Sequence, residues 1–182
     1  MTPLKKICVY CGSGPGRNPT YLAAAGKFGR ICADNNIGIV YGGANIGIMG
    51  EIASSALDAG GHVTGVLPRF WYKSSLMHEG LSELIITESM HERKQAMYEL
   101  SDAFVALPGG IGTLEELVEM MTWSQLGHHT KPIIMVNIDR FWQPLIFLLE
   151  HMEQDEFIRD GLKVAYEVAD NVDDILPKLQ LT

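Results

Sequence analysis

The sequence predicts a three-layer α/β fold, in which a mostly parallel sheet lies between helices on both faces. Segments with strand and helix character alternate along all 182 residues. The expected strands are apolar without interruption, which is typical of strands buried on both faces. Glycine-rich turns follow three of these strands, and ligands of such folds bind at that edge of the sheet. The length suits a single domain spanning residues 1–182.

The first half of the chain contains three strands, each ended by glycine or proline. Asn18-Pro19 opens the helix after the first strand, and Gly60-Gly61 closes the small-residue helix after the second. Residues 69–80 show no clear period and are expected to form a loop, with or without a short helix. The expected strands are residues 6–11, 37–41 and 62–67, and the expected helices are residues 20–34 and 48–59.

The second half repeats this alternation. Thr113 is a suitable N-cap for one helix, and Pro144 fits only the first turn of another. An apolar stripe of Met120, Met121 and Trp123 indicates either the core or a contact between subunits. The expected strands are residues 83–87, 103–107, 132–137 and 164–168, and the expected helices are residues 91–100, 114–126, 142–152 and 172–179.

The charge and hydropathy of the chain exclude several classes of protein. Acidic residues outnumber basic ones by 22 to 14, which gives a formal charge of −8. An acidic chain without a basic tract is not expected to bind nucleic acid or an anionic membrane. The N-terminal residues do not form a signal peptide, and no apolar stretch is long enough to span a membrane. We therefore expect a cytoplasmic protein, which can still bind a small phosphate ligand locally.

Cys8 and Cys11 form a C-x-x-C pair, a pattern found in some redox and zinc sites. They straddle an expected strand, however, and positions three apart on a strand point to opposite faces. A second C-x-x-C is lacking, and the adjacent His128-His129 is poorly spaced to chelate a metal. We therefore interpret the cysteines as structural and expect no bound metal.

The strongest functional motif lies in residues 107–117, where an expected strand ends and a glycine-rich loop precedes a helix. Gly109, Gly110 and Gly112 permit the backbone to approach a ligand closely. The unpaired N–H groups at the helix N-terminus make this loop, together with Thr113, a candidate phosphate site. The loop lacks the lysine of a P-loop and the spacing of the G-x-G-x-x-G dinucleotide loop.

Two acids, Glu115 and Glu116, are expected in the first turn after this loop. One interpretation is that they only complement the helix dipole. That effect accounts for one acid, but it does not explain a carboxylate beside a phosphate, which repels it. A carboxylate in this position is better explained if it contacts the sugar or a water molecule.

A second motif, residues 89–95, also follows an expected strand. Arg93 and Lys94 are expected in the first helical turn, where positive charge opposes the helix dipole. A phosphate or a catalytic carboxylate would supply the missing counter-ion. The alternative is a solvated ion pair with Glu92 or Glu99 at the surface.

Two further glycine-rich turns, residues 11–14 and 40–50, follow the first and second strands. They contribute Ser13 and Gly43 as candidate substrate contacts. One such turn is weak evidence of a ligand, because many α/β turns need glycine. Three of them at one edge of a sheet predict a common crevice.

The motifs M-x-x-R-K (residues 90–94) and P-G-G-x-G-T-x-x-E (residues 108–116) together resemble those of the Lonely Guy (LOG) family. Members of that family are cytokinin riboside 5′-monophosphate phosphoribohydrolases, long labelled lysine decarboxylases. The resemblance covers residues 7–149 and includes the family's Y-G-G-G-x-x-G-L-M-G, with Ala44 in place of glycine and Ile48 in place of leucine. It implies a modified Rossmann-like fold and a homodimer with active sites near the subunit interface.

The resemblance also implies a reaction without a cofactor. A purine or cytokinin nucleoside 5′-monophosphate, AMP included, reacts with water to give the free base and ribose 5-phosphate. By position, Arg93 and Glu116 correspond to the catalytic pair, and Glu115 is the weaker candidate. A carboxylate can stabilise an oxocarbenium-like transition state and orient water, while the arginine orients the carboxylate. The implied phosphate cradle is Gly109, Gly110, Gly112 and Thr113, and the implied neighbours of base and ribose are Met90 and Lys94.

Three other functions compete with this one. A pyridoxal phosphate-dependent decarboxylase needs a Schiff-base lysine, and only Lys94 and Lys131 lie near expected strand ends. A nicotinamide-dependent oxidoreductase needs the dinucleotide loop, which is missing. A non-catalytic nucleotide-binding or carrier protein stays open as the alternative. Arg93 together with Glu116 discriminates against it, because a pure binder needs no acid beside the phosphate.

Overall fold

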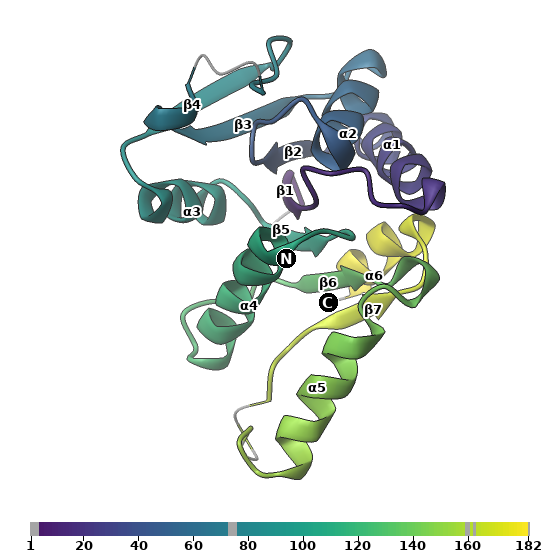
Figure 1. Cartoon of the computed structure of the whole chain (residues 1–182), viewed down its shortest axis with the longest axis vertical. Coiled ribbons are helices and arrows are strands. Elements are labelled where there is room, and N and C mark those ends of the chain that lie inside the picture. Colours follow the sequence, from purple (N-terminus) through teal and green to yellow (C-terminus); the bar gives the residue numbers. More distant parts are fainter. Residues whose placement is uncertain (1–3, 73–75, 159–160, 162, 182) are drawn as a thin grey trace.

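The computed structural model describes residues 4–72, 76–158, 161 and 163–181. Seven strands form one sheet in the order β4-β3-β2-β1-β5-β6-β7, and each neighbouring pair is parallel (Figure 1). The predicted α/β fold with its parallel sheet is therefore confirmed. The strands are β1 (Lys6–Tyr10), β2 (Gly38–Tyr41), β3 (Val63–Pro68), β4 (Glu83–Thr87), β5 (Ala103–Ala106), β6 (Ile133–Val136) and β7 (Glu167–Ala169).

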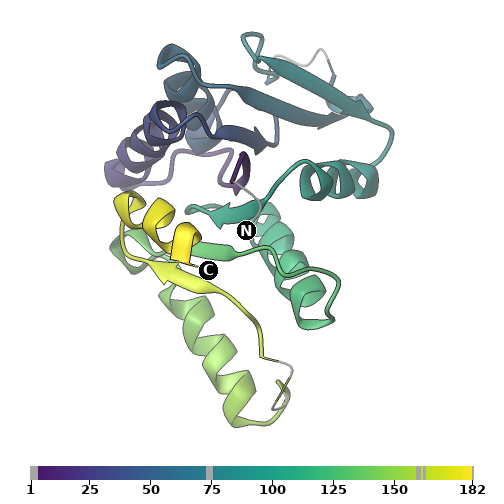
Figure 2. The ribbon, with the colours of Figure 1, turned by 180° about the vertical axis from the view of Figure 1, so that it is seen from behind.

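Helices cover both faces of the sheet (Figures 1 and 2). Because successive strand residues point to opposite faces, Ile7 packs into one apolar cluster and Cys8 into the other. The first cluster joins β1 to α1 (Pro19–Asp34), α2 (Gly47–Asp58) and α6 (Ile175–Leu181). The second joins it to α3 (Met90–Glu99), α4 (Ile111–Gln125) and α5 (Gln143–Gln154).

The cysteines have a structural environment. Cys8, Cys11 and Cys32 are free and buried, and Cys8 and Cys11 belong to opposite apolar clusters. Burial raises the pKa of the Cys8 thiol to about 12, so this group stays neutral. Within the described residues, no group of three or more His, Cys, Asp or Glu side chains is arranged to hold a metal ion. None of the described helices combines the length and apolar character needed to cross a membrane.

Most element boundaries agree with the sequence within two residues, and the larger differences lie near the C-terminus and at the start of α4. The strand expected at 164–168 begins at Glu167, and the helix expected at 172–179 is a 3-10 turn, Val172–Asp174, followed by α6. The irregular segment 69–80 contains a 3-10 turn, Arg69–Trp71, while its residues 73–75 lie outside the described part of the chain.

The start of α4 is the difference that matters for function. The helix begins at Ile111 with Gly110 as its N-cap, so the prediction that Thr113 caps it is wrong. Thr113 is instead inside the first turn, and its side chain occupies the space that a side chain on Gly109 would fill. Glycine at position 109 therefore lets the chain turn tightly into the helix, which begins three residues earlier than a Thr113 cap would place it.

The apolar stripe on α4 lies in the core of this chain. Met120 and Met121 are buried in the second apolar cluster, and Trp123 packs against it. Met120 and Met121 therefore belong to the core, while Trp123 is half-buried at its edge. The exposed apolar residues of the same helix lie elsewhere, at Ile111 and Val118.

Candidate active site

A cavity of about 450 Å³ lies at the carboxyl edge of the sheet. It is bordered by the ends of β1 and β2, by α3 and by the turn from β5 to α4. The chain leaves β1 and β2 toward one face of the sheet and β5 toward the other, which is where ligands bind in open α/β folds. All described residues that line the cavity lie between Cys11 and Glu116 in the sequence.

The turn from β5 to α4 forms one wall. Gly110, Gly112 and Thr113 line the cavity, and no described side chain caps the first N–H groups of α4. A Cβ added at Gly110 or Gly112 would meet nothing within 4 Å. Uncapped N–H groups beside open space, at the positive end of a 15-residue helix, suit a phosphate.

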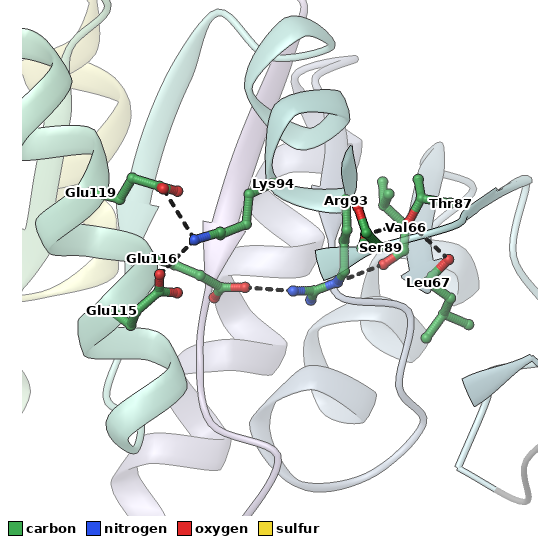
Figure 3. A network of polar contacts seen from close by, with 9 residues as sticks. All are labelled: Val66, Leu67, Thr87, Ser89, Arg93, Lys94, Glu115, Glu116 and Glu119. Atoms are coloured by element: carbon green, nitrogen blue, oxygen red, sulfur yellow. Dashed lines mark hydrogen bonds and ion pairs between the residues drawn. The ribbon is translucent and has the colours of Figure 1, made fainter. Parts of the chain in front are cut away.

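A buried ion pair between α3 and α4 borders the cavity (Figure 3). Arg93 Nη1 donates to Glu116 Oε1 at 2.8 Å, and the two side chains are 3% and 8% exposed. Arg93 Nε also donates to the Val66 carbonyl at 2.9 Å, which ties the guanidinium to β3. The predicted alternative, a solvated ion pair with Glu92 or Glu99, is therefore wrong.

Gly42 provides the space that this arginine occupies. A Cβ on Gly42 would lie 2.5 Å from Arg93 Nη2, and Gly42 itself lines the cavity. The neighbouring Gly43 has a positive φ of 80° and faces the Leu67 side chain. Sequence reasoning chose Gly43 as the substrate contact, but among the described residues Gly42 is the one that borders both cavity and arginine.

Glu116 lies deeper in its helix than the sequence suggested. It is the sixth residue of α4, and no acid occupies the first turn, so the predicted placement of Glu115 and Glu116 there is wrong. Interaction with the helix dipole falls off within the first turn and does not account for this residue. Burial raises the pKa of Glu116, and the Arg93 guanidinium opposes that rise. The pair thus holds a carboxylate, poorly solvated, at the cavity wall.

Lys94 turns away from the cavity that Arg93 borders. Its Nζ lies 2.5 Å from Glu115 Oε1 and 3.0 Å from Glu119 Oε1 (Figure 3). Glu115 lines the cavity, whereas Lys94 is not among the described lining residues. In this structure Lys94 therefore binds Glu115 and Glu119 and does not face the cavity.

The rest of the cavity is apolar, and sequence reasoning missed most of it. Met49, Leu67, Trp71 and Leu76 line this part. Asn45 N–H donates to the Leu76 carbonyl at 2.8 Å, so the irregular segment 69–80 is hydrogen-bonded at Leu76 to the β2–α2 turn. The run Phe70-Trp71-Tyr72, three aromatics in a segment without periodicity, was the available indication of a binding wall.

Comparison with known proteins identifies the family. The profile of a family described as "Possible lysine decarboxylase" matches residues 49–179. The cytokinin riboside 5′-monophosphate phosphoribohydrolase of Rhodococcoides fascians is 46% identical over 155 residues, covering 85% of this chain and 78% of that protein. The enzyme LOG2 of Arabidopsis thaliana, with the same activity in its name, is 39% identical, covering 97% and 83%. The chain belongs to the Lonely Guy family.

Solved structures place this Lonely Guy protein in a wider fold group. The molybdenum cofactor binding protein of Rippkaea orientalis has a TM-score of 0.74 and 22% identity, covering 100% of this chain and 98% of that one. A Moco carrier protein from Chlamydomonas reinhardtii has a TM-score of 0.71 and 22% identity, covering 98% and 97%. At this identity the likeness shows the fold alone.

The two Lonely Guy motifs converge on the cavity, but not with every residue. Arg93, Met90, Gly110, Gly112, Thr113 and Glu116 line it, together with Ser13 from the β1–α1 turn. Three other predicted residues are not among the described lining residues. Gly109 lies against Thr113, Gly43 lies against Leu67, and Lys94 donates to Glu115. The family motifs therefore combine residues that line the cavity with residues that pack behind them.

Proposed function

We propose that this protein hydrolyses the bond between base and ribose in cytokinin riboside 5′-monophosphates, AMP being a related candidate substrate. The observation that carries the proposal is the buried Arg93–Glu116 pair beside an uncapped helix N-terminus. The activity named for relatives at 39–46% identity supports it. One sheet contains all seven strands, which supports residues 1–182 acting as a single domain.

Phosphate binding and bond cleavage are assigned to different residues. The N–H groups near Gly110 and Gly112 hold the 5′-phosphate, which supplies binding energy from a part of the substrate that does not react. As the bond between the anomeric carbon and the base nitrogen breaks, positive charge develops on the ribose. The Glu116 carboxylate stabilises that charge and orients water. Water oxygen bonds to the anomeric carbon and loses one proton, while the base nitrogen retains the bonding electrons and gains one proton, so the sum is addition of water across the bond.

The environment of the lysines argues against the older decarboxylase label. Lys94 is held by two carboxylates, and Lys131 precedes β6 at the opposite edge of the sheet. No lysine is among the described residues lining the cavity. In the part of the chain that the structure describes, no amine is therefore placed in the cavity to form a Schiff base with pyridoxal phosphate. A pure carrier function leaves the Arg93–Glu116 pair unexplained.

We also propose that the protein is a homodimer, as the family resemblance implies. The exposed residues Ile111, Val118 and Leu126 lie along one face of α4, spaced by about two turns each. Ile111 also lines the cavity, so a subunit on this face would lie close to the site. Val118→Lys is expected to give a monomeric mass in sedimentation, whereas Phe147→Lys on α5 keeps the dimer. A monomer for the unmodified protein at micromolar concentration contradicts the proposal.

A product assay tests the activity. The purified protein is incubated separately with AMP, with isopentenyladenosine monophosphate and with lysine, and the products are separated by chromatography. We expect free base and ribose 5-phosphate from at least one nucleotide without any added cofactor. Adenosine with inorganic phosphate, or cadaverine from lysine, would contradict the proposed reaction.

A further inference from the structure

Two sets of ion pairs lie side by side between α3 and α4 (Figure 3). The inner set is Arg93 with Glu116, which borders the cavity. The outer set is Lys94 with Glu115 and Glu119. Consecutive residues of α3 thus bind consecutive acids of α4, so the position of one pair constrains the other.

The outer set is charged, and two of its members, Lys94 and Glu119, are largely shielded from solvent, whereas the Glu115 side chain is 53% exposed. The Lys94 side chain is 15% exposed, and Glu119 Oε2 is buried without a hydrogen-bond partner among the described residues. Burial lowers the pKa of Lys94, but hydrogen bonds to Glu115 and Glu119 outweigh it and raise the pKa overall. Lys94 is therefore a permanent positive charge that compensates two acids, of which Glu119 is the more buried.

We propose that Lys94 is a positioning residue: it holds Glu115 and Glu119 in place so that Arg93 keeps its hydrogen bond to Glu116. This inference rests on the proposed function. Glu115 lines the cavity, and without Lys94 its carboxylate is free to compete for Arg93 or to repel a bound phosphate. Lys94 thereby keeps the reacting carboxylate oriented and ionised without touching the substrate.

The charged and titratable groups around Glu116 determine the direction in which a substitution shifts its pKa. From α3 it faces Arg93 and Lys94, which lower its pKa, and on its own helix Glu115 raises it. From β1 it faces Cys8, Tyr10 and Cys11, whose pKa values are raised by burial, so all three stay neutral at physiological pH. Loss of Lys94 should therefore raise the pKa of Glu116, and loss of the Glu115 charge should lower it.

The test measures kcat/KM against pH for four variants. The Lys94→Met variant is expected to lose up to about 100-fold in kcat near neutral pH, with a smaller change in KM. Its acidic limb should move to higher pH, and that of Glu115→Gln to lower pH. The double variant should fall between them. Lys27→Met, which removes a surface lysine paired with Asp173, should leave the profile unchanged.

A ¹³C NMR titration of the Glu116 carboxyl provides a readout that needs no turnover. It should report the same opposite shifts in the two single variants. A raised KM with an unmoved acidic limb would assign Lys94 to substrate binding, and a lowered melting temperature alone would assign it to the fold; either overturns the inference. If the unmodified protein cleaves no nucleotide, the proposed function fails and the titration still decides the role of Lys94. If Lys94→Met does not fold, the shift of the acidic limb in Glu115→Gln decides the question: a shift to lower pH supports the inference, and an unmoved limb overturns it.

Discussion

The turn from β2 to α2 and the turn from β5 to α4 share a strand–glycine–helix pattern, yet their glycines have different physical roles. In the first turn, Gly43 faces Leu67 and Gly47 faces the Ser13 carbonyl, both with positive φ. In the second turn, Gly110 and Gly112 face open space at the cavity. Gly43 and Gly47 are thus needed for packing, whereas Gly110 and Gly112 leave N–H groups beside open space. The direction of the missing side chain therefore distinguishes a glycine that allows close packing from one that opens onto the cavity.

The strongest test of this contrast is the acid behind the open turn. Glu116→Gln keeps the size of the side chain but removes its charge, so turnover should fall about 100- to 1000-fold, or roughly 2.7–4 kcal/mol. Nucleotide affinity should change much less, because the phosphate contacts remain. Kinetics and calorimetry on the same protein measure both quantities.

Arg93→Ala should lower turnover severely as well, whereas Glu115→Gln should be milder near neutral pH. A dipole role alone for Glu116 would cost about 0.3–1 kcal/mol of stability and leave turnover intact. Near-normal turnover of Glu116→Gln would show that the reaction does not occur beside the open turn.

The packed turn should respond in folding rather than in catalysis. Gly47→Ala places a Cβ against the Ser13 carbonyl at a φ of 58°, and we expect a loss of about 2–4 kcal/mol of unfolding free energy. Gly60→Ala is the matched control, because its φ is 79° but nothing lies within 4 Å. Urea denaturation should show a clearly larger loss for Gly47→Ala. Equal losses would mean that backbone strain alone, and not packing, requires glycine at position 47.

The sequence predicted the order of elements because apolar strands and helical spacing are local properties. It located the two motifs at one edge of the sheet for the same reason. The pairing of Arg93 with Glu116 was expected from the family resemblance and from no local pattern. The contacts of Lys94 with Glu115 and Glu119 were not predicted, because they join helices brought together only by the tertiary fold. It placed the start of α4 too late, since a glycine N-cap leaves no side-chain pattern to read.

The open turn also predicts dependence on the 5′-phosphate. Adenosine should be a poorer substrate than AMP by at least about 10-fold in kcat/KM, the equivalent of one charged hydrogen bond of about 1.5 kcal/mol. Initial rates with the two compounds at equal concentration measure the ratio. Equal turnover of adenosine and AMP would show that the N-terminus of α4 does not bind the 5′-phosphate.

The smallest expected effect, that of a substitution at Gly112, compares the two glycine-rich turns most directly. Gly112→Ala adds a methyl group where nothing lies within 4 Å, inside a helix, so the protein should gain up to about 1 kcal/mol of stability. The same methyl group points toward the cavity, and KM for the nucleotide should rise. Thermal unfolding and steady-state kinetics check the two directions. A loss of stability would show that this glycine is needed for packing, as in the other turn.

The cavity draws all its described lining residues from one unbroken stretch, Cys11 to Glu116. The following part, with β6, β7, α5 and α6, widens the sheet and shields its faces. Evolution can therefore alter the two parts separately. Exchanges between relatives after Glu116 should transfer heat tolerance and assembly, whereas exchanges before it should transfer the choice of base. A chimaera joined within α4 would inherit its substrate preference from the parent that supplied the N-terminal part.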